Sequence, residues 1–253
     1  MAGVPKTRLD VLLVERNLAP SRERARAYIL AGRVLVNEQK VDKPGASVAS
    51  DSALRLLGDD MPYVSRGGLK LAGALALWPI QVKGRSCLDV GASTGGFTDC
   101  LLQHGAAHVT AIDTGFGQIA HKLRTDPRVT LLERTNARLL ESEQLAKDAV
   151  VPPLTLLVMD VSFISATLIL GPVFAAAPSL LEAVLLVKPQ FEAGREYVGK
   201  GGIVRDPAAH QLAIDKVVSC ITDLGWAIVG TIPSPITGAE GNIEFLLYAR
   251  RPS

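Results

Sequence analysis

Four charged residues far apart in the chain could do acid–base chemistry if the fold brought them together: Lys70, Asp160, Lys188 and Glu244. Lys188 closes the apolar run 184–187 and precedes Pro189, so its amine should emerge at a strand end inside a partly dry cleft. Burial and a second cation, for which Lys70 is the candidate, both favour a neutral amine that can accept a proton. The alternative is that Lys188 extends along apolar surface and keeps its charge in solvent.

The two acidic residues occupy comparable positions. Asp160 ends a neighbouring apolar segment, and Glu244 is expected within the last strand. The ends of three strands and the first helix of this region, which carries Lys70, can converge on one crevice. Without such convergence, Glu244 would be an ordinary charge on a strand face.

A glycine-rich turn follows the apolar segment that ends at Val90. Over residues 88–99 the chain reads LDVGASTGGFTD, which is typical of a strand, a turn and a helix start at a nucleotide-cofactor site. We expect Gly91, Gly95 and Gly96 to let the backbone bend and approach a ligand closely. A tight turn with no ligand is the structural alternative.

Asp113 strengthens the cofactor interpretation, because a carboxylate at the end of the next apolar segment can accept hydrogen bonds from both ribose hydroxyls. The pattern Gly91-x-Ser93-x-x-Gly96 lacks the middle glycine that lets the main chain touch the pyrophosphate of a dinucleotide. S-adenosylmethionine has no pyrophosphate, and Asp89 could pair with its ammonium group or cap the turn. The sequence therefore favours S-adenosylmethionine over a nicotinamide dinucleotide.

Strand-like runs alternate with helical stretches through most of the chain. The expected strands are 86–90, 109–113, 129–133, 154–160, 183–187, 226–232 and 243–249. This alternation predicts an α/β fold, Rossmann-like, with a mostly parallel seven-stranded sheet between helices and a hairpin-like final pair. The glycine-rich, charged segment 194–206 should line the substrate crevice.

The N-terminal residues form a small basic module. Apolar spacing predicts a helix over 8–15, a Ser21-capped helix over 22–31 ended by Gly32, and a hairpin over 33–41 with its turn at 38–39. Arg22 and Arg26 lie one turn apart on the second helix. Such arginines suit a phosphate backbone, although a solvated basic helix is the alternative. Residues 58–62 read as a linker, which gives domains 1–60 and 61–253.

Several short motifs carry a resemblance to a known family. Residues 8–37, with RLD at 8–10 and SRERA at 21–25, resemble the S4 RNA-binding domain, and residues 65–249 resemble the FtsJ-type methyltransferase domain. The combination is similar to the haemolysin A (TlyA) family over nearly the whole chain. Its motifs here are SRGGxKL at 65–71, DVGASTGGFT at 89–98, ERTNAR at 133–138, DVSFIS at 160–165 and VKPQFE at 187–192.

The resemblance implies an S-adenosylmethionine-dependent enzyme that methylates a ribose 2′-hydroxyl of ribosomal RNA, with cytidine as target. Lys70, Asp160, Lys188 and Glu244 would form the catalytic tetrad of 2′-O-methyltransferases. The partners would be ribosomal RNA or ribosomal subunits, and a monomer is favoured. The expected cofactor-binding residues are Asp89, Gly91, Ala92, Ser93, Gly95, Gly96, Phe97, Asp113, Asn136 and Asp160, and the expected RNA-binding residues are Arg8, Arg22, Arg26, Arg33 and Arg66. Phe191 could stack on a splayed base or belong to the core.

Composition argues against several other functions. With 48% hydrophobic and 21% charged residues the chain can bury a core, while a net charge of +2 is too small to indicate a nucleic-acid partner by itself. The three cysteines and four histidines lack metal-ligand spacing, so we expect no metal and a cytoplasmic protein with reduced thiols. The family name suggests a membrane-damaging cytolysin as the rival function. Against it, the uncharged segment 161–177 is shorter than a bilayer span of about 20 residues, and neither a secretion signal nor a basic amphipathic helix with aromatic anchors is recognisable.

Overall fold

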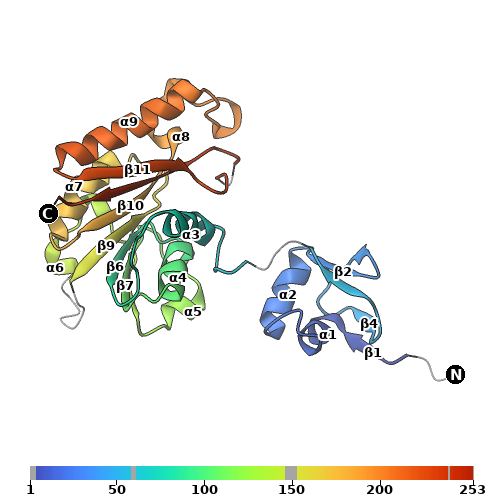
Figure 1. Cartoon of the computed structure of the whole chain (residues 1–253). Coiled ribbons are helices and arrows are strands. Elements are labelled where there is room, and N and C mark those ends of the chain that lie inside the picture. The colour runs from blue at the N-terminus through green and yellow to red at the C-terminus, as the bar shows by residue number, and fades with distance from the viewer. Residues whose placement is uncertain (1–3, 58–60, 146–152, 239, 253) are drawn as a thin grey trace. The chain divides into compact units, whose positions relative to one another are not determined.

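The computed structural model describes residues 4–57, 61–145, 153–238 and 240–252. The chain divides into two compact units, Met1–Asp60 and Met61–Ser253, coloured blue and cyan to red in Figure 1. Of the expected linker, residues 58–60 lie outside the described part of the chain.

The N-terminal unit packs two helices and two small sheets around one core. Ser21 caps the second helix through a hydrogen bond that its Oγ accepts from Arg24 N at 3.2 Å, and Gly32 follows the helix in the left-handed region at φ 65°. The core is built from Leu9, Leu13 and Ile29, among others. The elements are β1 (Lys6–Arg8), α1 (Leu9–Glu15), α2 (Arg22–Leu30), β2 (Val34–Val36), β3 (Gln39–Lys40), β4 (Ser47–Ala49) and β5 (Leu54–Leu56).

Two expectations for this unit need correction. The hairpin turn lies at Asn37 and Glu38, one residue earlier than predicted, because both take positive φ angles of 48° and 63° that suit a tight hairpin. The sequence also predicted only two helices and a hairpin, whereas β1 pairs with β4 and β5 pairs with β2. Strands of three residues are too short to show an alternating pattern, so only their distant partners define them.

The C-terminal unit contains a seven-stranded sheet in the order β11-β12-β10-β9-β6-β7-β8. Only β12 runs antiparallel to its neighbours, which confirms the predicted mostly parallel sheet. The strands are β6 (Ser86–Val90), β7 (His108–Ile112), β8 (Val129–Leu132), β9 (Leu154–Met159), β10 (Glu182–Val187), β11 (Ala227–Pro233) and β12 (Phe245–Arg250). The helical elements are α3 (Gly67–Leu77), α4 (Gly96–Gln103), α5 (His121–Arg124), η1 (Ala137–Leu139), α6 (Ser142–Leu145), α7 (Thr167–Ala176), α8 (Pro189–Glu192), η2 (Arg195–Tyr197), η3 (Lys200–Gly202) and α9 (Pro207–Asp223).

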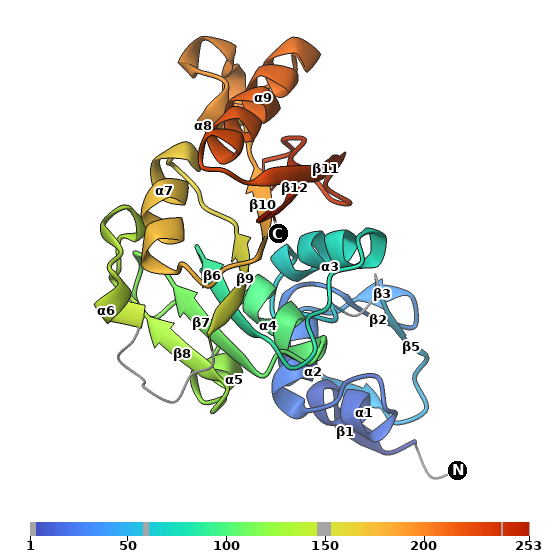
Figure 2. The ribbon, with the colours of Figure 1, turned by 60° about the vertical axis from the view of Figure 1, so that its left-hand side comes forward.

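Two hydrophobic cores cover the two faces of this sheet. One contains residues of α7 and α9, such as Leu170 and Val217, and the other contains residues of α3 and α4, such as Leu71 and Leu101. Figures 1 and 2 show these helix pairs on either side of the strands. The uncharged segment that precedes and includes α7 packs into the first core, and no helix in the described residues is both long enough and apolar enough to span a membrane.

The start of the last strand differs from the prediction. β12 begins at Phe245, which pairs with Val187, the last residue of β10. Glu244 therefore lies just before the strand, where β10 no longer offers a pairing partner. Its backbone oxygen instead accepts a hydrogen bond from Ser234 N at 2.8 Å.

Candidate active site

Lys188 and Asp160 meet at the carboxyl ends of two adjacent parallel strands. Asp160 follows β9 directly and Lys188 follows β10 directly, so strand pairing fixes both positions. Lys188 Nζ lies 2.6 Å from Asp160 Oδ1 and donates a hydrogen bond to Ser162 Oγ at 2.8 Å. Only 9% of the Lys188 side chain is exposed, so the amine is buried and does not extend into solvent.

Lys70 and Glu244 form a second buried ion pair. Lys70 comes from the first turns of α3 and Glu244 from the residue before β12, and Lys70 Nζ lies 2.5 Å from Glu244 Oε2. Both residues are almost fully buried. Charges are buried at a cost of several kcal/mol unless they are paired, which accounts for the close contact.

One cavity connects these two ion pairs. Its volume is about 450 Å³, and its lining includes Lys70, Asp160, Ser162 and Lys188. Glu244 does not line the cavity but contacts Lys70, which does. The structure thus brings together all four charged residues that the sequence singled out. An amine held by a carboxylate and a hydroxyl in such a cavity can take a proton from a bound hydroxyl group.

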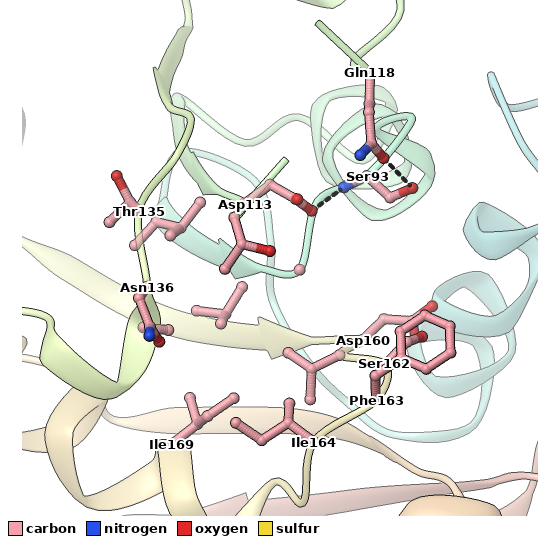
Figure 3. Close-up of a pocket in the computed structure, with 16 residues that line it drawn as sticks. Ser93, Asp113, Gln118, Thr135, Asn136, Asp160, Ser162, Phe163, Ile164 and Ile169 are labelled. Carbon is pink, nitrogen blue, oxygen red and sulfur yellow. Dashed lines mark hydrogen bonds between the residues drawn. The ribbon is translucent and has the colours of Figure 1, made fainter. Parts of the chain in front are cut away.

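A second cavity, of about 310 Å³, adjoins the first and is drawn in Figure 3. This volume lies within the range of about 300–1,000 Å³ that is usual for small-molecule sites. The two cavities share Gly91, Ser93, Asp160 and Ser162. Of the residues predicted to hold a cofactor, Gly91, Ser93, Asp113, Asn136 and Asp160 line this second cavity, whereas Ala92, Gly96 and Phe97 line only the first.

Most of the remaining wall of the second cavity was not predicted from the sequence. Its polar side chains come from the segments that follow β7, β8 and β9, and its apolar ones come from the ends of β6 and β7, from those segments and from α7. The missed residues are Val90, Ile112, Thr114, Gln118, Thr135, Ala137, Val161, Ser162, Phe163, Ile164 and Ile169. Most of these residues lie within a few positions of a predicted strand end, and this proximity could have indicated that they line the site.

Asp113 organises the glycine-rich turn from the neighbouring strand. Its Oδ2 accepts a hydrogen bond from Ser93 N at 2.8 Å (Figure 3). Its Oδ1 accepts one from Gly115 N at 2.7 Å. Each carboxylate oxygen has a further lone pair available for a ligand. The side chain is half-buried at the cavity wall, as an acceptor for ribose hydroxyls requires.

The predicted bend is present, since Gly91 and Gly95 take positive φ angles of 86° and 95°, and packing within the protein leaves no room for a side chain at these glycines. A Cβ on Gly91 would lie 2.4 Å from the backbone oxygen of Asp160, and one on Gly95 would lie 2.2 Å from Leu123 Cδ1. A Cβ on Gly96 would lie 2.4 Å from Ser65 Oγ, just before α3. The turn therefore holds the strand ends and helix starts close together around the cavities.

Asp89 is not brought to either cavity. Its side chain is fully buried, and Oδ2 accepts a hydrogen bond from Thr98 Oγ1 in α4 at 2.6 Å, while Oδ1 has no hydrogen-bond partner among the described residues. Burial raises the pKa of the Asp89 carboxyl to about 7. The carboxyl group therefore ties β6 to α4 through Thr98, and Asp89 lines neither cavity.

Two of the predicted RNA-binding arginines form ion pairs within the N-terminal unit. Arg8 and Arg22 both contact the buried carboxylate of Asp10, at 3.0 Å each. The hydrogen bond from Arg8 holds the pKa of Asp10 well below its usual range. Both guanidinium groups are still more than half exposed, so they can also reach a ligand.

The other three arginines have different surroundings. Arg26 is exposed on α2, and Arg33 lies over the Tyr28 ring and donates to the backbone oxygen of Leu57 at 2.9 Å. Arg66, in the C-terminal unit, lines the larger cavity and donates to Thr237 O at 3.2 Å. Arg66 is thus the predicted RNA-binding residue that the structure places beside the buried ion pairs.

An aromatic pair lies beside the buried lysine. The Phe191 ring is 5.4 Å from the Phe163 ring and 6.0 Å from Lys188 Nζ. Phe191 is half-buried, which excludes a fully enclosed core position, while Phe163 is 92% exposed at a positive φ of 66°. No feature of the sequence had indicated that Phe163 would be the exposed member.

Comparison with known families and proteins agrees with this architecture. The model of the FtsJ-like methyltransferase family matches residues 63–251, and that of the S4 domain matches residues 7–52. The chain is 46% identical to the 16S/23S rRNA (cytidine-2′-O)-methyltransferase TlyA of Mycobacterium tuberculosis, over 97% of this chain and 90% of that protein. It is 42% identical to Hemolysin A of Brachyspira hyodysenteriae, over 95% of this chain and 98% of that protein.

A solved structure is similar over almost the whole chain. It is that of a Streptococcus thermophilus protein with a hemolysin label, 41% identical, with a TM-score of 0.72 and coverage of 99% of this chain and 90% of that one. Together, these matches confirm the resemblance that the short motifs indicated.

Proposed function

The chain belongs to the FtsJ-like methyltransferase family, and from this premise we propose that it transfers a methyl group from S-adenosylmethionine to a cytidine ribose 2′-hydroxyl of ribosomal RNA. The observation that carries the proposal is the junction of two cavities at Asp160, with the buried Lys188 amine on the larger one. A methyl donor in the smaller cavity and a ribose in the larger would meet at this junction.

The residues around the smaller cavity fit the cofactor. Asp113 offers acceptors for ribose hydroxyls, and Ile112, Ile164 and Ile169 supply an apolar wall against which an adenine ring can pack. Asn136 lies nearby, although its side chain also caps η1 by accepting a hydrogen bond from Arg138 N at 3.1 Å. S-adenosylmethionine supplies a methyl group on a positively charged sulfur, which becomes an uncharged thioether when the methyl leaves.

Lys188 is the base in this proposal. A ribose hydroxyl is a poor nucleophile, so it must be oriented and lose its proton as the new bond forms. Lys188 in its neutral form accepts that proton, and Asp160 holds the amine and stabilises the ammonium group that results. Lys70 and Glu244 complete the tetrad, with Lys70 as a fixed positive charge on the same cavity.

Ribosomal RNA as substrate is supported by the relatives and by the basic N-terminal unit. The M. tuberculosis relative is named for both 16S and 23S rRNA and for cytidine, and the S4 match covers residues 7–52 here. The partner in this proposal is ribosomal RNA or a ribosomal subunit, the acting form is a monomer, and the place of action is the cytoplasm, where ribosomes are.

Mapping of ribose methylation tests the proposal directly. Ribosomal RNA from cells with and without this gene is compared nucleotide by nucleotide, and the purified protein is then incubated with the unmodified RNA and radiolabelled S-adenosylmethionine. We expect a cytidine 2′-O-methyl group to be absent without the gene and restored by the purified protein. Identical methylation maps would disprove the assignment.

The hemolysin label of some relatives calls for a second measurement. Lysis of erythrocytes by the wild-type protein and by Lys188→Met separates the two activities, because membrane damage does not require a base at this position. Lysis that persists in the variant, without any methyl transfer by the wild type, would favour a cytolysin.

A further inference from the structure

Ser162 contacts the buried amine of Lys188 and lines both cavities. We propose that Ser162 is a positioning residue, whose hydroxyl fixes the direction in which Lys188 presents its lone pair to the substrate hydroxyl. The inference rests on the proposed function and adds a residue outside the four charged ones.

The tetrahedral geometry of the Lys188 amine limits where its lone pair can point. A neutral lysine nitrogen has, besides its bond to Cε, two N–H groups and one lone pair. Among the described residues, Nζ of Lys188 has two hydrogen-bonding or ion-pair partners, Asp160 Oδ1 at 2.6 Å and Ser162 Oγ at 2.8 Å. The contact with Asp160 Oδ1 is a close ion pair that lacks hydrogen-bond geometry, so Ser162 Oγ is the acceptor that fixes one N–H direction. With that N–H group held and the second drawn towards the carboxylate charge, the lone pair takes the remaining direction, and Lys188 lines the larger cavity.

Asp160 alone would not achieve this. With a single acceptor, rotation about the Cε–Nζ bond lets the second N–H group and the lone pair exchange places. A lone pair that points away from the ribose cannot accept its proton. The Ser162 hydroxyl therefore selects the orientation in which the lone pair faces the ribose. Because a hydroxyl is neutral, it does so without adding a charge to the site.

The segment that carries Ser162 is held at both ends. Asp160 N donates to Val90 O at 3.0 Å, and Ala166 N donates to the buried Glu192 at 2.7 Å. Between them, Phe163 adopts a left-handed backbone conformation that is uncommon for a bulky residue. Figure 3 shows Asp160 and Ser162 together after the end of β9. The hydroxyl is thus part of a fixed loop conformation, which is what a positioning role requires.

The same contacts persist through the reaction. The O–H bond of the ribose breaks and its proton goes to the lone pair of Nζ, while the electron pair of the oxygen forms the bond to the methyl carbon. The bond between carbon and sulfur breaks with its electrons on sulfur. The Lys188 ammonium group then has three N–H groups, one of which keeps Ser162 as its acceptor, and its charge stays paired with Asp160.

Ser162→Ala tests the proposal, because Ser162 is exposed and its replacement should leave the fold intact. Single-turnover methyl transfer is measured with saturating RNA and S-adenosylmethionine, and the affinities for RNA and S-adenosylhomocysteine are measured separately. We expect the rate to fall by about 10–100-fold, as for a misplaced reacting group, with both affinities unchanged. Ser162→Thr, which keeps the hydroxyl, should restore most of the rate.

Ser179→Ala is the matched control. The Ser179 hydroxyl also makes one 2.8 Å hydrogen bond, to Leu154 O at the other end of β9, so its loss should leave the rate unchanged. A wild-type rate in Ser162→Ala would overturn the proposal, and so would equal losses in the Ala and Thr variants. A loss of cofactor affinity with an unchanged saturated rate would overturn it too, since Ser162 would then be a cofactor contact. If the wild-type protein itself fails to methylate ribose, the proposed function is at fault.

Discussion

The chemistry of the candidate site depends on two lysines that are buried beside carboxylates. Lys188 pairs with Asp160 and Lys70 pairs with Glu244, and both pairs border one cavity. Removing one partner of a buried pair leaves an uncompensated charge, which costs about 3–5 kcal/mol. Single substitutions therefore report on catalysis only when folding and ligand binding are measured alongside the rate.

Lys188→Met should abolish methyl transfer while RNA and cofactor affinities stay near those of the wild type, because the side chain is assigned to proton transfer. Lys188→Arg should fail as well, since a guanidinium group keeps its charge but does not release a proton near neutral pH. Single-turnover rates and calorimetry check both variants. An arginine variant with a near-native rate would leave Lys188 as an electrostatic contact only.

Asp113→Ala should weaken S-adenosylmethionine binding by roughly 1–3 kcal/mol, because the change removes a charged acceptor from the cavity wall. Calorimetric titration measures the difference. Asp126→Ala serves as a control, since Asp126 pairs with Arg128 away from both cavities. Equal affinities of the Asp113 variant and the control would show that the carboxylate does not contact the cofactor.

Asp89 should make the C-terminal unit less stable as pH rises. The pKa of its carboxyl is about 7 in the folded protein, well above that of an exposed aspartate, so the folded state holds a proton that the unfolded state has lost. The free energy of unfolding therefore falls between about pH 4 and pH 7 through this group.

Asp89→Asn removes that dependence, so the variant should gain stability relative to the wild type between pH 5 and pH 8. Urea unfolding followed by tryptophan fluorescence reports on this unit alone, because both tryptophans, Trp78 and Trp226, lie in it. A stability difference that is the same at both pH values would mean that Asp89 is already ionised at pH 5.

At the scale of elements, single helices and strand ends carry the functional groups. The paired strands β9 and β10 end side by side, which brings Asp160 close to Lys188. Lys70, in α3, contacts Glu244, the residue that precedes β12. In the N-terminal unit, α2 carries Arg22 and Arg26, yet only Arg22 is tied to the buried Asp10. The two arginines therefore differ in what their loss should do.

Arg26→Gln should weaken RNA binding and reduce the slope of log affinity against log salt concentration by about 0.7–0.9, the effect of one phosphate contact. Arg22→Gln should do the same and also lower the melting temperature of the N-terminal unit, because Asp10 loses one of its two partners. Binding titrations at several salt concentrations and thermal unfolding separate these effects. An unchanged salt slope in Arg26→Gln would show that this face of α2 does not meet RNA, with Arg55→Gln as the control on the same unit.

At the scale of the whole molecule, the chain has two compact units with separate cores. All residues that line the two cavities belong to Met61–Ser253. The segment before α3 belongs to that unit as well, because Val64 N donates to Asp99 in α4 at 2.8 Å and Tyr63 is buried. Both cavities thus lie in one unit, while four of the five predicted RNA-binding arginines, Arg8, Arg22, Arg26 and Arg33, lie in the other.

A fragment of residues 61–253 should bind S-adenosylhomocysteine with the affinity of the full chain and should bind RNA much more weakly. Calorimetry measures the first quantity and salt-dependent RNA titration the second. Circular dichroism confirms that the fragment is folded. Undiminished RNA affinity would place the main RNA contacts in the C-terminal unit.

Local sequence patterns were sufficient to predict the strands of the large sheet and the chemical types at their ends. Alternating apolar runs predicted the seven strands, and short motifs placed Lys70, Asp160 and Lys188 at strand or helix positions that the structure confirms. Periodicity and turn residues are local properties, so they can be read without knowledge of the fold. The same is true of the Ser21 cap and of Gly32 after the second helix.

The partners that these groups meet follow from the packing of segments that are distant in the chain. Lys70 and Glu244 lie 174 residues apart, and no local pattern could show that Glu244 precedes its strand and contacts that lysine. Asp89 and Asp113 look alike in the sequence, as acids at strand ends, but one is buried against Thr98 and the other lines a cavity. Asp89 lies inside β6, where α4 packs against it, whereas Asp113 follows the end of β7 at the cavity edge. What packs around each position is a property of the assembled layers and not of the strands themselves.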